Sequence, residues 1–287
     1  MRYGIIANPK SGKLSIDDKR IILEHASSIL QDCKIYGLDT CSAEEFRSCA
    51  DEVSRKVGTL VVAGGDGTLH DVINSVSQEA LLSYLPLGSG NAIKYALSLP
   101  ETISETAEQI KKGNKHSLDL ILCDNSKKTF VADVGLGGYI MNEREKNLHK
   151  GKKGRLAYAL ASVGQALEYE RGNATVVVDN EKLSFNNIWS FVLTKIRCGG
   201  YGLNVMPKAR LDDGYIHFLA IDSNWLELFY GLTTAFLGKN KVGKYIACKK
   251  VQIVTSKKEY LEIGGDVDRK DTNFVFEILP GCLQMKY

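Results

Sequence analysis

Val61-Val62-Ala63-Gly64-Gly65-Asp66-Gly67-Thr68-Leu69-His70 is the stretch of sequence that decides the fold. The apolar run over residues 59–63 is typical of a buried parallel strand, because such strands are covered on both faces. After the glycines, apolar residues recur with helical spacing, at positions 69, 72, 73 and 76. The stretch therefore predicts a strand, a loop over Gly64–Thr68 (the glycine loop) and a helix.

The glycine loop is suited to an anion. Its three glycines can take backbone angles closed to other residues, so several N–H groups can point at one anion beside the positive end of the helix. A nucleotide polyphosphate fits that description. Asp66 is unfavourable beside phosphate unless a cation lies between them, which indicates Mg²⁺ or a role in proton transfer. The alternative is a plain strand-to-helix turn in which Asp66 and Thr68 act only as local caps.

Length, charge and cysteine content narrow the class of protein. The 287 residues exceed the usual size of one core, so two domains are expected. A formal net charge of +3 gives no global signal for nucleic acid. Seven cysteines without a C-x-x-C pair suit a reducing cytoplasm and argue against a zinc site or a disulfide scaffold. No apolar stretch approaches the roughly 20 residues that span a bilayer, so we expect a cytoplasmic protein, at most peripheral on a membrane.

The pattern of the chain changes near residue 119. Short apolar runs alternate with helical patterns before it, which predicts a parallel α/β domain over residues 1–118. Closely spaced strand candidates after it predict a mostly antiparallel β-sandwich over residues 119–287, with the last residues as candidates for a return to the first domain. The strand candidates are 129–133, 174–178, 188–194, 215–221, 251–255 and 274–278.

Two further loops are expected at the carboxyl edge of the parallel sheet. The N-terminal loop, Asn8-Pro9-Lys10-Ser11-Gly12-Lys13, follows the first apolar run and so lies at the same edge as the glycine loop. Ser11, Gly12 and Lys13 could offer hydroxyl, backbone and ammonium groups to phosphate, although a Walker A loop has a longer glycine interval. The third loop, Pro86-Leu87-Gly88-Ser89-Gly90-Asn91-Ala92, is again followed by a helical pattern. Taken alone, each of these two loops is weak evidence for a phosphate site.

Together, in this order and spacing, the three loops resemble those of the diacylglycerol kinase catalytic-domain superfamily of lipid kinases, which includes sphingosine kinases and bacterial diacylglycerol kinase-like proteins. The resemblance extends through residues 154–158, residues 207–214 and Gly264-Gly265-Asp266. NAD kinases share the glycine loop, whereas Gly88-Ser89-Gly90-Asn91 is similar to a lipid-kinase element, in a form closer to the sphingosine kinases. The resemblance implies a Rossmann-like α/β domain of the NAD kinase and phosphofructokinase type, followed by the β-sandwich.

The resemblance also implies where ATP binds. Its phosphates would be held by Gly64, Gly65, Asp66, Gly67 and Thr68, with further contacts from Asn8, Ser11, Gly12, Thr40 and Ser89. Thr40 stands where the family has a nucleotide-contacting threonine, but Thr40-Cys41-Ser42 would serve equally well as an N-cap region.

A structural Mg²⁺ in the second domain is a further implication of the resemblance. Asp212-Asp213-Gly214 is similar to the D-D-G element of the family, so the ligands would be the Asp213 carboxylate and the backbone carbonyls of Arg210 and Tyr215. From the residues alone, Asp-Asp-Gly between Leu211 and Tyr215 is a good β-turn.

Near the end of the chain the sequence departs from the family. Family members carry Asp-Gly-Glu, whose glutamate is the expected general base, where this chain has Gly264-Gly265-Asp266. Asp266 stands at the base position and can accept a proton if a slight shift restores hydrogen-bond reach of about 3 Å. Asp268 is the nearest other carboxylate. The alternative is that this segment is only a hairpin turn and the protein is a weak or inactive kinase.

The sequence thus predicts an ATP- and Mg²⁺-dependent kinase of a diacylglycerol-like or sphingoid-like lipid, in which Asp66 supports the metal and Asp266 takes the hydroxyl proton. An NAD kinase-like enzyme and a nucleotide-binding regulator with little turnover are the alternatives. The expected partner is a lipid at a membrane surface, and the basic stretch over residues 146–155 is either a contact for anionic head groups or a solvated loop. The oligomeric state is left open, a homodimer included.

Overall fold

The structure, a computed structural model, describes residues 2–146, 164–199 and 202–287 of the 287-residue chain. The chain divides into two compact units. Unit 1 comprises Met1–Leu120, Cys198–Gly202 and Pro280–Tyr287, and unit 2 comprises Ile121–Arg197 and Leu203–Leu279.

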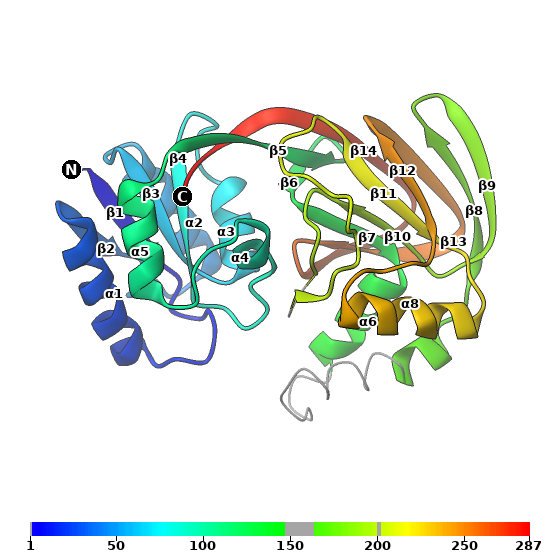
Figure 1. Cartoon of the computed structure of the whole chain (residues 1–287), viewed down its shortest axis with the longest axis horizontal. Helices are drawn as coiled ribbons and strands as arrows, with labels where there is room; N and C mark the ends of the chain where they lie inside the picture. The colour runs from blue at the N-terminus through cyan, green and yellow to red at the C-terminus, as the bar shows by residue number, and fades with distance from the viewer. Residues whose placement is uncertain (1, 147–163, 200–201) are drawn as a thin grey trace. The chain divides into compact units, whose positions relative to one another are not determined.

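Unit 1 alternates strands and helices (Figure 1). Its elements are β1 (Tyr3–Ala7), α1 (Ile16–Leu30), β2 (Cys33–Tyr36), α2 (Ala43–Ser54), β3 (Thr59–Gly64), α3 (Asp66–Ile73), β4 (Leu81–Pro86), α4 (Ala92–Ala96) and α5 (Ile103–Lys112). The strands pair in parallel in the order β2-β1-β3-β4. The end of the last strand, β14 (Asp266–Lys286), adds to this sheet by pairing in parallel with β4, where Gln284 lies opposite Leu81. The predicted strand and helix are confirmed as β3 and α3, whereas the loop between them is shorter than Gly64–Thr68, because Gly64 ends β3 and Asp66 begins α3.

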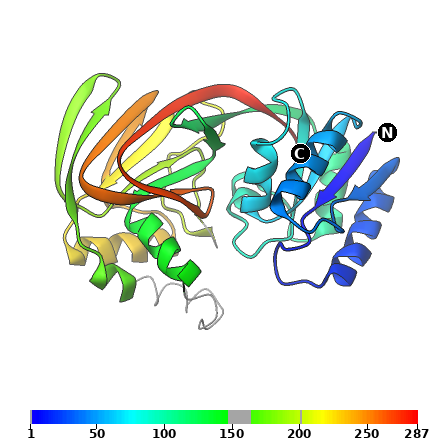
Figure 2. The same ribbon diagram turned by 180° about the vertical axis from the view of Figure 1, so that it is seen from behind.

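Helices cover both faces of this sheet, which explains why β1 and β3 are apolar along their whole length (Figures 1 and 2). On one face, Leu23 and Ala26 of α1 and Ile110 of α5 pack against β1 and β3. On the other face, α2 contacts β1, β3 and α3. Polar residues set the starts of the helices, because the side chains of Ser15, Ser42 and Thr102 accept hydrogen bonds from backbone amides of the first turns of α1, α2 and α5.

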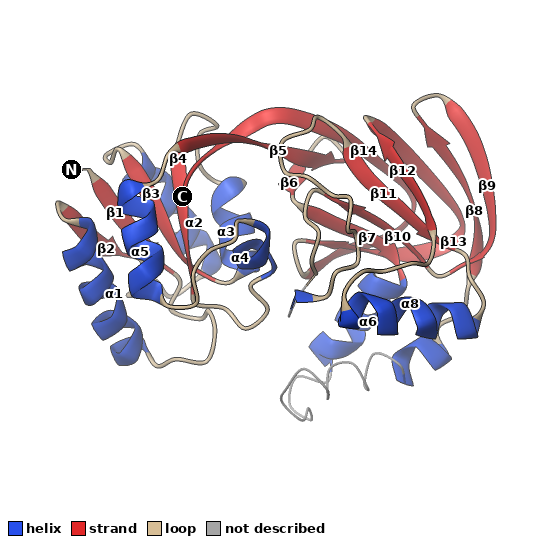
Figure 3. Cartoon of the chain, in the orientation of Figure 1, coloured by secondary structure: helices blue, strands red, loops and turns tan. Residues whose placement is uncertain are grey.

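Unit 2 is built mainly of antiparallel strands (Figure 3). Its elements are the end of β5 (Lys115–Cys123), β6 (Lys127–Thr129), β7 (Val131–Gly135), α6 (Leu136–Lys146), β8 (Gly172–Val178), β9 (Glu181–Ile188), β10 (Ser190–Thr194), β11 (Ile216–Ile221), α8 (Trp225–Leu237), β12 (Lys244–Cys248), β13 (Lys250–Ile263) and most of β14. The strands pair in the order β12-β11-β10-β7-β13-β14, while β8 pairs with β13 and β9. The predicted antiparallel β-sandwich is confirmed.

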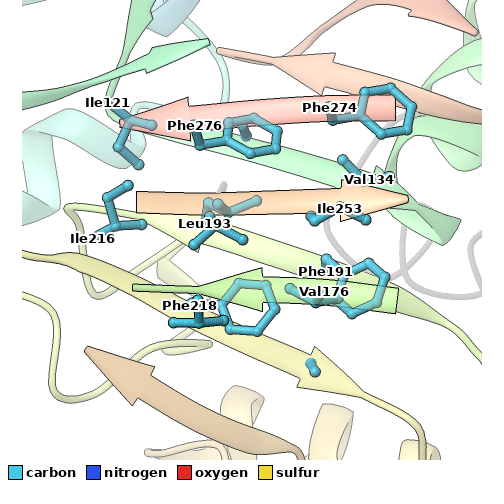
Figure 4. Packing of buried hydrophobic residues seen from close by; sticks show 14 of the residues in the cluster. Ile121, Val134, Val176, Phe191, Leu193, Ile216, Phe218, Ile253, Phe274 and Phe276 are labelled. Atoms are coloured by element: carbon cyan, nitrogen blue, oxygen red, sulfur yellow. The ribbon is translucent and has the colours of Figure 1, made fainter. Parts of the chain in front are cut away.

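The core of unit 2 lies among these strands. Phe191 of β10, Phe218 of β11, and Phe274 and Phe276 of β14 pack with branched aliphatic side chains such as Ile253 (Figure 4). The long strand β13 unites two groups of strands, because residues 251–255 pair with β8 and residues 261–263 pair with β7. In the described part of the chain, no helix is both long and apolar enough to cross a membrane. The basic stretch over residues 146–155 lies, apart from its first residue, outside the described residues.

Candidate functional site

The three glycine-containing loops of unit 1 meet at the carboxyl edge of its sheet. A Cβ atom added to Gly88 would lie 2.4 Å from the Cα of Gly65, and one added to Gly12 would lie 2.2 Å from the carbonyl oxygen of Leu87. Gly12 also has a φ of +69°, which favours glycine. The Leu87 N–H donates to the Gly64 carbonyl at 2.7 Å. These loops therefore touch backbone to backbone, and only glycine permits that approach.

The amino terminus of α3 opens at this meeting point. Gly65 is the N-cap residue of α3 and, among the described residues, no side chain caps it. Thr68 is 5% exposed, and its hydroxyl accepts a hydrogen bond from the Asn8 amide at 3.2 Å. Thr68 thus joins the glycine loop to the N-terminal loop instead of capping the helix. The first amides of α3 keep their capacity to bind an anion.

Asp66 ties the glycine loop to the third loop. Its two carboxylate oxygens accept hydrogen bonds from the backbone N–H groups of Ala92 at 2.9 Å and Ile93 at 3.1 Å, which are the first residues of α4. Burial raises the pKa of Asp66, while the two amide hydrogen bonds act in the opposite direction. The carboxylate therefore fixes the start of α4 against the start of α3.

A buried lysine holds the N-terminal loop in shape. Lys19 of α1 is 1% exposed and its ammonium donates to the carbonyl oxygens of Asn8, at 3.2 Å, and Pro9, at 2.6 Å. Desolvation by burial lowers the pKa of Lys19. Lys19 thus fixes the backbone of the N-terminal loop through these two carbonyl oxygens. In this loop the hydroxyl oxygen of Ser11 lies close to the glycine loop, 3.7 Å from a Cβ atom built on Gly65. No pattern of residues around Lys19 predicted this role.

Thr40 and Ser89 lie on two different loops of unit 1. The Thr40 hydroxyl donates to the carbonyl of Gly37 at 2.7 Å, and the N-cap residue of α2 is Ser42. Ser89 is exposed in the third loop, one residue before Gly90. Ser42 is therefore the residue of this region that caps a helix. Thr40 instead closes a turn after β2.

The residues of unit 1 fit a nucleotide better than a caged metal ion. Glycine backbones that approach each other this closely, beside an uncapped helix start, provide amide groups without side-chain obstruction, as polyphosphate recognition requires. Within the described ranges, no group of three or more histidine, cysteine or acidic residues is arranged to hold a metal ion. This arrangement is compatible with Mg²⁺, which usually binds through substrate phosphates and waters and needs few protein ligands.

The predicted metal ligands of unit 2 surround a lysine. The ammonium of Lys195, which is 0% exposed, donates to the Asp213 carboxylate and to the Tyr215 carbonyl, both at 2.6 Å. The other Asp213 oxygen lies 3.0 Å from Nε2 of His217, and the Arg210 N–H donates to that nitrogen at 3.1 Å. A cation bound to the same oxygens would have to displace the ammonium. These residues do not fit a resident metal ion.

Gly264 and Gly265 form the turn between β13 and β14. Their φ angles are +63° and +101°, and Ile263 pairs with Asp266 across the turn. Such a two-residue hairpin needs positive φ at both positions, which explains the two glycines. Asp266 is exposed at the first position of β14. The segment is therefore a hairpin turn that presents a carboxyl group to solvent.

Two buried carboxyl groups behind this turn were missed in the sequence. Glu262 of β13 lies opposite Asp133 of β7, and both are at most 9% exposed. Burial, with the nearby charge of Asp133, raises the pKa of Glu262 to about 8, although the Gly265 N–H donates to it. Burial raises the pKa of Asp133 to about 6, against hydrogen bonds from Ser190 at 2.6 Å and from the Gly137 amide at 3.0 Å. Alternating strand patterns gave no sign that these acids point inward.

Two family models match the chain. Residues 2–123 match the diacylglycerol kinase catalytic domain. Residues 133–286 match the YegS C-terminal NAD kinase beta sandwich-like domain. The two matches together cover nearly the whole chain.

Curated relatives and a solved structure resemble the chain over much of its length. A diacylglycerol kinase of Bacillus subtilis is 24% identical over 279 residues, which cover 92% of this chain and 89% of that relative. A protein of Shewanella frigidimarina named probable lipid kinase YegS-like is 26% identical over 188 residues, 63% of this chain and 60% of that relative. A crystal structure described as a diacylglycerol kinase of Bacillus anthracis has a TM-score of 0.79 at 19% identity and covers 100% of this chain and 96% of that one.

Proposed function

We propose that this chain, which belongs to the diacylglycerol kinase catalytic-domain family of lipid kinases and carries a YegS-type β-sandwich domain, transfers the γ-phosphoryl group of ATP to a hydroxyl group of a diacylglycerol-like or sphingoid-like lipid. The observation that carries the proposal is the meeting of three glycine-containing loops beside the uncapped start of α3. The relative named diacylglycerol kinase supports the class of acceptor.

Unit 1 supplies the groups for the phosphates. In this proposal the backbone amides at the start of α3 bind the polyphosphate, and the hydroxyl and amide side chains of the adjoining loops add hydrogen bonds. Asp66 acts by holding the glycine loop and α4 together, because both of its oxygens already accept backbone hydrogen bonds. Mg²⁺ bound with ATP would neutralise phosphate charge during transfer. The residues proposed to contact ATP are Asn8, Ser11, Gly12, Thr40, Gly64, Gly65, Gly67, Thr68 and Ser89, together with Asp66 through its backbone N–H at the start of α3.

Unit 2 supplies the proton acceptor. As the lipid oxygen forms its bond to the γ-phosphorus and ADP leaves, the hydroxyl proton passes to a carboxylate, which we assign to Asp266. Asp266 is exposed and is thus accessible to a hydroxyl. Glu262 is a weaker candidate at neutral pH, because its raised pKa of about 8 keeps most of it protonated there.

Membrane contact is proposed through α8. One side of this helix is buried through Leu228, whereas Leu226 is 83% exposed, Phe229 57% and Leu237 79%. Exposed aromatic and leucine side chains on one helix suit insertion at the boundary between head groups and acyl chains. The exposed Lys239 and Lys241 directly after the helix favour anionic lipids. An enzyme whose acceptor resides in a bilayer needs such a contact.

A phosphoryl-transfer assay tests the proposed function. Labelled ATP with Mg²⁺ is offered to mixed micelles of diacylglycerol, monoacylglycerol, ceramide, sphingosine or phosphatidylglycerol, with NAD as a soluble acceptor. We expect label in at least one lipid, and a loss of about 10²-fold or more in Asp266→Asn, whose matched control is the exposed Asp222→Asn. Label in NAD alone would contradict the lipid acceptor, and ATP binding without any labelled product would indicate a regulator.

A further inference from the structure

The turn before β11 holds a buried positive charge at the place where the family resemblance implies a metal ion. Lys195 follows the last residue of β10, and its backbone N–H donates to the Phe130 carbonyl at 2.8 Å. Its ammonium is 0% exposed, so it has exchanged water for protein oxygens. Such burial is unfavourable unless the charge is paired and hydrogen-bonded.

The oxygens around this ammonium are those expected to bind the metal. Asp213 gives one carboxylate oxygen and Tyr215 gives its backbone carbonyl, each 2.6 Å from the ammonium nitrogen. Gly214, with a φ of +73°, allows the tight turn that brings the two oxygens to the same side. Mg²⁺ would have to sit about 2.1 Å from these oxygens and would therefore overlap the ammonium.

The charges of the cluster balance without a metal ion. The Asp213 carboxylate and the Lys195 ammonium form an ion pair at 2.6 Å, so the buried ammonium has a counterion within the turn. The His217 imidazole lies beside this pair, with its Nε2 accepting from the Arg210 N–H at 3.1 Å and its Nδ1 2.8 Å from the Tyr245 hydroxyl. One carboxylate and one ammonium thus face each other inside the turn.

We propose that the ammonium group of Lys195 takes the place of the structural metal ion at this turn, so that unit 2 keeps its fold without a bound cation. The inference rests on contacts inside unit 2 and does not depend on kinase activity. It confines any Mg²⁺ requirement of the enzyme to the nucleotide.

Metal content and thermal unfolding without nucleotide test this inference on the full chain. After treatment with EDTA and desalting, the wild type is measured with and without millimolar Mg²⁺ or Ca²⁺, beside Lys195→Met, Asp213→Asn and the exposed ion-pair control Lys250→Met. We expect well under one metal ion per chain and the same Tm in the wild type under all conditions. We also expect Lys195→Met to lower Tm by about 5 °C or more in EDTA, and Lys250→Met to lower it much less.

Two results would overturn the inference. One is a stoichiometric metal ion in the wild type, or a Tm raised by Mg²⁺ or Ca²⁺ in the wild type and unresponsive in Asp213→Asn. The other is a Lys195→Met variant as stable in EDTA as the wild type. If Lys195→Met does not fold, the metal content and cation response of the wild type decide the question.

Discussion

Replacing Glu262 by glutamine is expected to stabilise the folded chain, and to do so increasingly as the pH rises. The folded state keeps a proton on Glu262 up to a pKa of about 8, whereas an unfolded chain releases it near 4.5. The stability that this proton gives is full below the unfolded pKa and is lost as the pH rises through the folded one. Glutamine cannot ionise and therefore avoids this loss.

The size of the effect follows from the difference between the two pKa values. One pH unit is worth 1.36 kcal/mol, so over roughly 2.5 units the difference at pH 7 is about 3 kcal/mol in favour of Glu262→Gln. Near pH 5 the same reasoning gives less than about 1 kcal/mol. The pKa of Asp133 is raised to about 6, so this residue titrates at lower pH than Glu262. Asp133 is present in the wild type and in Glu262→Gln, so its own titration contributes to the stability of both proteins.

Thermal and denaturant unfolding between pH 5 and 8.5 measure this difference. The wild type is compared with Glu262→Gln and with Glu181→Gln, an exposed glutamate on β9. A stability advantage of Glu262→Gln that widens toward alkaline pH supports a protonated Glu262. Equal stability above pH 7, or an advantage that does not change with pH, would refute the reasoning.

Three further predictions concern the loops and α8. Asp66→Ala removes both hydrogen bonds to the start of α4 and should lower the free energy of unfolding by about 2 kcal/mol and raise KM for ATP, as measured by denaturant unfolding and kinetics; unchanged values would contradict its positioning role. Lys19→Met leaves two carbonyls without their buried donor and should cost about 1–3 kcal/mol and weaken ATP binding in titration calorimetry; wild-type affinity would argue against this support. The double variant Leu226→Glu/Phe229→Glu should lose cosedimentation with anionic vesicles while it keeps activity on a dispersed short-chain lipid; unchanged sedimentation would exclude α8 as the contact.

Local patterns in the sequence predicted most of the fold. The buried run before Gly64 and the helical spacing after Thr68 gave β3 and α3 directly, because both sides of β3 are covered and one side of α3 is apolar. The strand candidate at 251–255 lies within β13. Each of these patterns depends only on residues that are close together in the sequence, so it can be recognised without the structure.

Contacts between distant residues explain what the sequence did not predict. Lys195 and Asp213 are 18 positions apart, and nothing near either residue shows that one is the counterion of the other. Glu262 and Asp133 meet only because β13 pairs with β7. The capping role of Asp66 toward α4 likewise depends on how the third loop folds over the glycine loop. From the sequence alone, charged residues at such positions are predicted to lie on the surface, because their partners are known only from the structure.

The central claim, that the three glycine-containing loops bind ATP for lipid phosphorylation, is tested most directly by the initial rate of phosphoryl transfer from labelled ATP to lipid in Gly88→Ala. The added Cβ would fall 2.4 Å from the Cα of Gly65, whereas in the control, Gly164→Ala, it meets no described atom within 4 Å. We predict a loss of about hundredfold in Gly88→Ala, because the loops must separate, and a wild-type rate in Gly164→Ala. A folded Gly88→Ala enzyme with the wild-type rate would contradict the claim.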